Sequence, residues 1–367
     1  MAAAARLVGT WLQLGLETAV ALALGLAVGS AARVRAVLLP GAAPAARVAL
    51  RFGIMLLGAR LTLGQLLDTG GASVVAITVV VAVGLLLGTT LARRFDVRPP
   101  LSALITVGMA ICGNSAILAL APIVRAPHRE TAYAVSTITI FGLVGVLLLP
   151  VLGAALGLSD AVFGMWAGLA VNDTAQVVAT GYAYSPAAGD VATVVKLTRN
   201  LAILPVLLGA SWLTVRAARD AAGSRDGGVA WIGGDAGASD AGVATGSSIG
   251  LVARAVPWFV IGFVVFAGLR TAGLLDGALP TGGTLADLCS VVAAVLILVA
   301  LAGVGISTDV RAMVGVGAGP FVLGAAMWIA MGLLALGLSA VVAGSAGVSA
   351  SGFGGALTAL VADYHGG

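Results

Sequence analysis

Long apolar runs separated by short polar segments restrict how this chain can fold more than any other feature. One helical crossing of a hydrocarbon core of about 30 Å needs about 20 consecutive apolar residues. Several runs reach that length, among them residues 8–29 and 72–92. Only 9% of the 367 residues are charged and 60% are hydrophobic, whereas water-soluble domains carry about 25% charged residues. The sequence therefore predicts an all-α polytopic membrane protein.

Charged residues, glycines and prolines bound the apolar runs and predict about ten transmembrane helices. These cover residues 8–29, 48–67, 72–92, 101–124, 131–157, 160–182, 191–217, 251–272, 284–305 and 316–343. Residues 218–250 are rich in Gly, Ser and Asp, so we expect a flexible cytoplasmic linker there. The linker separates a seven-span part, residues 1–217, from a three-span part, residues 251–344, and residues 345–367 form either a tail or a half-helix.

Basic residues set the expected orientation, because Lys and Arg collect in cytoplasmic loops. With both termini outside, twelve of the 19 basic residues fall on the cytoplasmic side. Five fall on the outer side, namely Arg6, Arg60, Arg125, Arg129 and Arg270. The calculated pI of 9.6 thus reflects arginines in loops. We expect the lipid bilayer as a partner and no nucleic acid.

Two segments on either side of the linker resemble each other. Residues Gly58–Gly64 end the second span and residues Gly303–Asp309 end the ninth, and in both a glycine is followed by a hydroxyl residue. The two spans run in opposite directions in the predicted topology, which is typical of inverted repeats in transporters. A chance match in a glycine-rich chain is the alternative.

The run 101–126 carries a polar interruption at its centre, Cys112-Gly113-Asn114-Ser115. Backbone groups freed from a helix at this depth are tolerated only where protein buries them or where they line a wet cavity. A break in a spanning helix is therefore typical of a transport site. The alternative is that Asn114 and Ser115 hydrogen-bond to a neighbouring helix at a packing seam.

Polar residues also lie at the centre of two later runs. They are Asn172, Asp173, Thr174 and Gln176 in the run 160–182, and Lys196 and Arg199 in the run 191–217. A carboxylate at mid-bilayer costs at least ~2.5 kcal/mol, so Asp173 should face the bundle interior beside a partner. At a rise of ~1.5 Å per residue, Asn114, Asp173 and Arg199 all fall about 12 to 15 Å below the outer surface.

Two interpretations of this layer stay open. In one, Asp173 forms a buried ion pair with Lys196 or Arg199 that sets helix register. In the other, the two cations exceed the one carboxylate, and either a bound anion or the loss of a proton from Lys196 relieves the excess. Arg binds oxyanions in a bidentate manner. The second interpretation predicts an anion site formed by Gly113, Asn114, Ser115, Lys196 and Arg199. It also predicts a coupling-ion or gating layer formed by Asn172, Asp173, Thr174 and Gln176.

The sequence gives little support to metal or redox chemistry. Cys112 and Cys289 lie in apolar runs, as structural cysteines do, and only His128 and His365 are histidines. No paired metal-ligand spacing is present. We expect no metal site, no cofactor other than a coupling Na⁺, and no enzymatic activity, since the spans offer a single clear mid-depth acid.

The motifs together resemble the YeiH-type family of bacterial inner-membrane proteins, which carries a sulfate-exporter label. The matching pieces are Arg51–Ile54, Gly58–Thr62, Ile111–Gly113, Ala121–Ala126, Ala175–Ala179, Lys196–Arg199 and Gly303–Thr308. The resemblance implies a multi-pass inner-membrane protein related in fold to the sodium/proton antiporters and bile-acid symporters. It further implies panel and core domains, broken crossing helices and an elevator-like movement of the core.

The chain departs from the family pattern where relatives have a His-Glu pair before the Ala-Gln-Val-Val run, because it has Asn172-Asp173 instead. The acid is kept in shorter form and the titratable imidazole is lost. Our hypothesis is a secondary active transporter of a small anion, sulfate or a sulfonate, coupled to Na⁺ or H⁺, with a homodimer as one assembly. The alternative is a membrane ion or pH sensor, or a scaffold, without transport.

Overall fold

The computed structural model describes residues 17–29, 32–223, 258–277, 284–307 and 318–345. Six of its helices are long and apolar enough to cross a membrane. Two shorter apolar helices, α5 (Leu101–Ala110) and α13 (Trp258–Thr271), accompany them. The prediction of an all-α polytopic membrane protein is confirmed.

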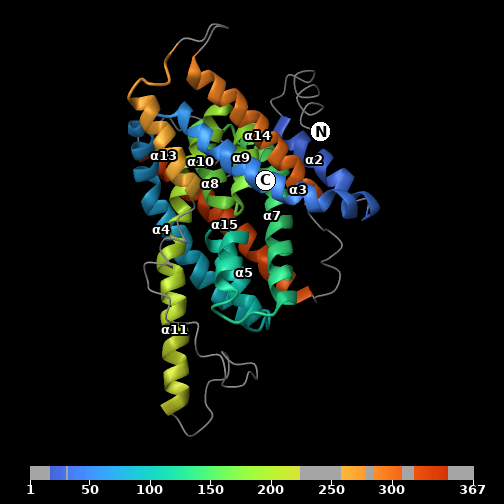
Figure 1. The fold of residues 1–367 in the computed structure, drawn as a ribbon. Coiled ribbons are helices and arrows are strands. Elements are labelled where there is room, and N and C mark those ends of the chain that lie inside the picture. Colours follow the sequence, from blue (N-terminus) through green and yellow to red (C-terminus); the bar gives the residue numbers. More distant parts are fainter. Residues whose placement is uncertain (1–16, 30–31, 224–257, 278–283, 308–317, 346–367) are drawn as a thin grey trace, which may run out of the picture.

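The helices pack as two groups (Figure 1). The first group contains α2 (Glu17–Gly29), α3 (Ala32–Leu57) with the short helix η1 (Gly58–Arg60), α13 and α14 (Leu285–Ser307). The second group contains α4 (Leu63–Arg94), α5, α6 (Asn114–Leu120), α7 (His128–Ala155), α8 (Asp160–Ala170), α9 (Thr174–Tyr184), α10 (Pro186–Asn200) and α15 (Ala318–Ser345). Helix α11 (Ile203–Gly223) follows α10 and extends beyond the other helices.

Small residues bring α8 and α10 into close contact. Gly164 and Gly168 lie one turn apart on α8. A Cβ atom added at Gly164 would lie 2.6 Å from the Ala188 carbonyl oxygen, and one at Gly168 would lie 2.8 Å from Val195 Cβ. Glycines four residues apart let helix backbones approach closely in a membrane. The approach places the later part of α10 beside the end of α8.

Helices α8 and α9 form a hairpin, so the predicted crossing at residues 160–182 is wrong. Ser185, directly after α9, donates a hydrogen bond from Oγ to Asp160 Oδ1, at the start of α8, over 2.7 Å. The rings of Phe163 and Tyr184 stack with their centroids 3.9 Å apart. The first turn of α8 and the last turn of α9 therefore lie at the same end of the molecule.

Helices α5 and α6, which come earlier in the chain, also form a hairpin. It replaces the predicted crossing of residues 101–124. A Cβ atom added at Gly108 would lie 2.9 Å from Ile117 Cγ1, so the two helices lie against each other. Glu130, in the first turn of α7, lies against the backbone of Leu101 at the start of α5. Because few residues separate α6 from α7, the end of α6 lies at the end where α5 begins.

The two hairpins enter from opposite ends of the molecule. The first hairpin, α5–α6, follows the end of α4, and the second hairpin, α8–α9, follows the end of α7. Helix α15 runs antiparallel to α4, because Gly319 lies near Phe95 and Gly84 lies near Met331. The two hairpins therefore point in opposite directions, one after α4 and one after α7. The inverted repeats expected from the sequence stay a prediction.

The first hairpin also changes the predicted distribution of charge. Arg125 and Arg129 follow α6, so they lie at the same end as Arg93, Arg94 and Arg98 rather than on the outer side. The correction enlarges the excess of basic residues at the end that the arginines predict to be cytoplasmic. The orientation derived from the sequence therefore becomes stronger.

Some sequence predictions fall at the limits of the described residues. Helix α11 continues to Gly223, past the predicted start of the linker at residue 218. Residues 224–257 and 346–367 lie outside the described residues, as do Thr308 and Asp309 of the repeated segment. The division of the chain at residues 218–250 stays a prediction.

Thiol labelling from one side of the membrane tests the α5–α6 hairpin. In a Cys112→Ala, Cys289→Ala background, we expect Arg125→Cys to react with an impermeant maleimide from the same side as Arg98→Cys. Leu274→Cys, in the turn after α13, should react from the opposite side. Labelling is measured in spheroplasts and inverted vesicles, and an Arg125→Cys that reacts together with Leu274→Cys contradicts the hairpin.

Candidate functional site

The tip of the first hairpin is a sharp turn that needs glycine. Helix α5 ends at Ala110 and α6 begins at Asn114, so the predicted interruption is present. Gly113 has φ of +62° and ψ of −123°, a conformation that strains any residue with a side chain. A Cβ atom there would lie 3.3 Å from the backbone carbon of Asn172. The tips of the two hairpins are therefore in contact.

The tip of the second hairpin holds two of the predicted residues. Asp173 is the N-cap of α9, and its Oδ1 accepts a hydrogen bond from the Ala175 N–H over 2.9 Å. Asn172 is buried and directs its amide away from Asp173. Its Nδ2 donates to Met109 Sδ over 3.0 Å, and its Oδ1 accepts from Arg199 Nη2 over 3.4 Å. Asn172 thus links the second hairpin to α5 and α10.

Two cations from α10 bind the ends of both broken helices. Lys196 Nζ donates to the carbonyl oxygens of Ile111, at 3.1 Å, and Val171, at 3.2 Å. Arg199 donates to four carbonyl oxygens and to the Asn172 side chain. Its carbonyl acceptors are Ala110 at 3.3 Å, Leu169 at 2.6 Å, Val171 at 3.4 Å and Met109 at 3.0 Å.

These contacts have a direct electrostatic reason. The last four carbonyls of a helix lack partners within the helix, and the helix dipole places negative partial charge at that end. Helices α5 and α8 both end inside the second group, where water does not reach. Lys196 and Arg199 are 0% exposed and lie where both negative ends meet. The two cations therefore make the two breaks tolerable in the membrane.

In this structure Lys196 and Arg199 are engaged by helix ends, and their predicted contact with an anion stays a prediction. A guanidinium has five N–H donors, and the five contacts of Arg199 account for all of them. An anion would reach Arg199 only by displacing helix carbonyls. Within the described residues Asp173 makes no salt bridge to Lys196 or Arg199, whose donors go to backbone oxygens and to the Asn172 side chain.

Asp173 instead faces the side chain of Asn114. Asn114 Nδ2 lies 3.4 Å from Asp173 Oδ2 and 3.4 Å from Thr139 Oγ1 of α7. Asn114 Oδ1 is buried without a hydrogen-bond partner. Ser115 is exposed, and Thr174 is partly exposed. Asn114, Ser115, Asp173 and Thr174 therefore form the accessible side of the tips, opposite the cations.

Gln176 lies one turn into α9 and joins the second hairpin to α7. Its Nε2 donates to the Thr139 carbonyl oxygen over 2.9 Å, and its amide packs on Gly142, which has no side chain to exclude it. Its Oε1 is buried and has no hydrogen-bond partner. Gln176 is thus close to the predicted layer but is held by α7.

The sequence did not reveal two parts of this site. Thr139 meets both Asn114 and Gln176, and the sequence did not single it out because Ser136 and Thr137 lie beside it in α7. The carbonyl oxygens that receive Lys196 and Arg199 gave no signal, because every residue carries one. Only the positions of the helix ends identify them.

Comparisons with known proteins agree on one family. The family model described as conserved hypothetical protein 698 matches residues 1–324. A UPF0324 membrane protein of Clostridium tetani is 32% identical over 275 residues, which cover 75% of this chain and 74% of that protein. Similar proteins of Streptococcus mutans and Geobacter sulfurreducens are each 32% identical, covering 81% and 79% of this chain and 82% and 81% of their own lengths. No solved structure matches the chain significantly.

Substitution of Arg199 tests its role at the helix ends. We expect Arg199→Gln to lower stability by about 3 kcal/mol or more, because each orphaned buried acceptor costs about 1 to 3 kcal/mol. Arg199→Lys should also destabilise, since the three donors of an ammonium cannot replace the five of the guanidinium and would leave buried acceptors unpaired. Thermal unfolding in detergent, followed by tryptophan fluorescence, measures the effect. The exposed Arg98→Gln is the control, and an Arg199→Lys variant as stable as the parent contradicts this role.

Proposed function

We propose that this chain, which belongs to the family of UPF0324 membrane proteins, is a secondary transporter of a small anion. Sulfate and organic sulfonates are the substrates that its resemblance to the YeiH-type family favours. The coupling ion would be Na⁺ or H⁺, and the second helix group would move relative to the first in an elevator-like manner. The supporting observations come from the two hairpin tips and from the surface between the groups.

The contact between Asn114 and Asp173 carries the proposal. These side chains come from hairpins that enter from opposite ends of the molecule, and they meet at 3.4 Å. Irregular backbone at membrane depth is tolerated where it lines a cavity, and transporters place their sites between such broken helices. The two hairpins approach this polar contact from opposite sides of the membrane. A site between them could therefore open to either side in turn, as alternating access requires.

The charges of this layer favour an anion without direct contact by the cations. Arg199 and a protonated Lys196 would carry two positive charges against the one negative charge of Asp173, which would leave the layer with an excess of positive charge. The donors of Arg199 are occupied, but its field still acts over several Å in a medium of low dielectric. We assign contact with the anion to Asn114 and Ser115, and we keep Lys196 and Arg199 as the source of attraction.

Coupling is assigned to the acid. Asp173 Oδ2 faces the Asn114 amide nitrogen, which also faces Thr139 Oγ1, and the Asn114 amide carries a buried Oδ1 without a hydrogen-bond partner. A proton or Na⁺ on the Asp173 carboxylate is the coupling ion that this group favours. No imidazole lies in this layer, because the histidines of the chain are His128 and His365. Proton coupling, if used, would therefore act through Asp173. We propose no catalytic chemistry for this site.

A flux assay with purified protein in liposomes tests the proposal. The panel consists of sulfate, sulfonates and carboxylates, with Na⁺ and pH gradients applied separately. We expect Asn114→Ala and Asp173→Asn to lower flux roughly tenfold or more, the size of one lost hydrogen bond to a charged group. Asp68→Asn, an exposed acid on α4, is the control.

Two outcomes would count against this proposal. Full flux in both Asn114→Ala and Asp173→Asn would place the site elsewhere. An absence of flux for every anion in the parent protein would favour the sensor or scaffold alternative. Thermal unfolding of each variant separates a lost site from a lost fold.

A further inference from the structure

The surface between the two helix groups is mostly apolar. Its buried residues come from both groups and include Ile54, Leu57 and Phe263 from the first and Val178, Val194 and Leu197 from the second. Apolar packing has no preferred direction. Such a surface stabilises contact between the groups but sets their relative position weakly.

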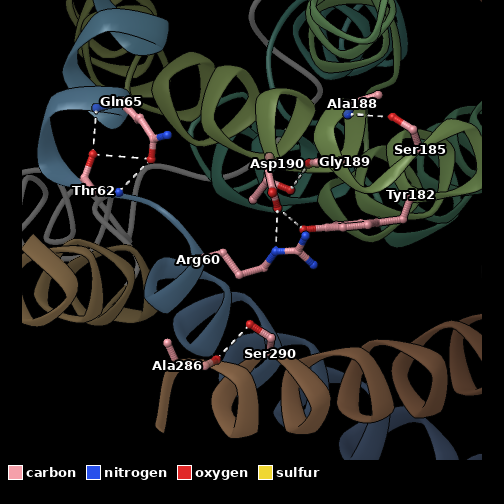
Figure 2. Close-up of polar contacts among 11 residues, drawn as sticks. Arg60, Thr62, Gln65, Tyr182, Ser185, Ala188, Gly189, Asp190, Ala286 and Ser290 are labelled. Atoms are coloured by element: carbon pink, nitrogen blue, oxygen red, sulfur yellow. Dashed lines mark hydrogen bonds and ion pairs between the residues drawn. The ribbon is translucent and has the colours of Figure 1, made fainter. Parts of the chain in front are cut away.

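A polar cluster crosses this surface at the end predicted to face outward. Arg60 of η1 belongs to the first group, and Tyr182 of α9 and Asp190 of α10 belong to the second (Figure 2). Arg60 Nε lies 3.3 Å from Asp190 Oδ1, and the Tyr182 hydroxyl donates to the same oxygen. The Arg60 guanidinium lies 5.6 Å from the centre of the Tyr182 ring. Three directional contacts thus converge on one oxygen and one ring.

Glycines beside the cluster bring its members together. Gly58 begins η1 against the Phe263 backbone, with no space for a side chain. Gly189 precedes Asp190, and a Cβ atom there would lie 2.5 Å from the Tyr182 ring. The ring therefore lies flat on α10 with its hydroxyl at the Asp190 carboxylate. The backbone on both sides is shaped to form this contact.

We infer that Arg60, Asp190 and Tyr182 form a latch that holds the two helix groups in the position seen here and opens when they move. This inference rests on the movement in the proposed function, but it concerns a separate place on the molecule. The Arg270–Asp276 ion pair lies within the first group and would stay formed. The Leu63 N–H bond to Thr271 Oγ1, 2.8 Å long, lies where the chain passes between the groups, so rotation about that point spares it.

The surroundings of the latch suit reversible opening. The side chains of Arg60 and Asp190 are 29% and 17% exposed, so both regain water at low cost when they separate. A cavity of about 330 Å³ adjoins Arg60 and is lined by Arg270, Asp287 and Ser290. A partly exposed ion pair is worth up to about 1 kcal/mol and a cation–π contact a similar amount. Contacts of this size bias a position without locking it.

The rate at which a buried thiol reacts measures opening, even when the open form is rare. Val178 lies in the surface between the groups and is 0% exposed. In a Cys112→Ala, Cys289→Ala background carrying Val178→Cys, we expect Asp190→Asn to raise the rate of reaction with a small methanethiosulfonate about fivefold. Arg60→Gln should give at least the same rise, because it removes the ion pair and also the contact with the Tyr182 ring. The double variant should give no rise beyond that of Arg60→Gln, because both changes remove the same ion pair.

Three controls make the result decisive. Asp276→Asn breaks an ion pair at the same end but within one group, and it should leave the rate at Val178→Cys unchanged. Leu104→Cys, buried inside the second group, reports general unfolding and should react at the parent rate in every variant. Equal rates in the parent, Asp190→Asn and Arg60→Gln would overturn the latch, as would a rise that Leu104→Cys or Asp276→Asn shares. The assay uses no substrate, so the latch can hold even if no flux is found.

Discussion

The fold depends on the binding of helix carbonyls by Lys196 and Arg199. Two half-helices end in the interior of the second group, and each would leave several carbonyl oxygens without partners and with negative partial charge. The cations of α10 receive acceptors from both helices, and Arg199 uses every donor it has. The cations and the carbonyl oxygens stabilise each other, because an unpaired charge and an unpaired carbonyl are both unfavourable in the membrane. The two breaks and the two cations therefore require one another.

This balance separates two chemical faces of the hairpin tips. On one face the two cations are buried and hydrogen-bonded to helix carbonyls, and they form the rigid part of the layer. On the other face Asn114, Ser115, Asp173 and Thr139 keep hydrogen-bonding capacity, including the unpaired Asn114 Oδ1. A site that binds and releases an ion needs this second face to be adaptable while the first holds its shape. The proposed transport site and the latch at Arg60 both depend on the second group behaving as one unit.

The extent to which sequence reasoning succeeded differs between particular residues. The sequence predicted the break at Gly113, because glycine followed by two polar residues is unfavourable in an apolar run. It also predicted that Lys196 and Arg199 share one face of a helix. Their partners were not, because an anion, a carboxylate and a helix carbonyl all satisfy a buried cation. The sequence suggested the first two, whereas helix ends brought together by the Gly164 and Gly168 contacts supplied the third.

The sequence by itself determined the membrane class, the polar layer and its depth, because hydropathy and charge act residue by residue along the chain. Only the tertiary structure decided that residues 101–124 and 160–182 fold back instead of crossing. A break near the centre of an apolar run lies equally far from both of its ends, so its depth is the same whether the second half continues or returns. The choice depends on contacts with distant helices, such as α10 and α7, and no local pattern records them.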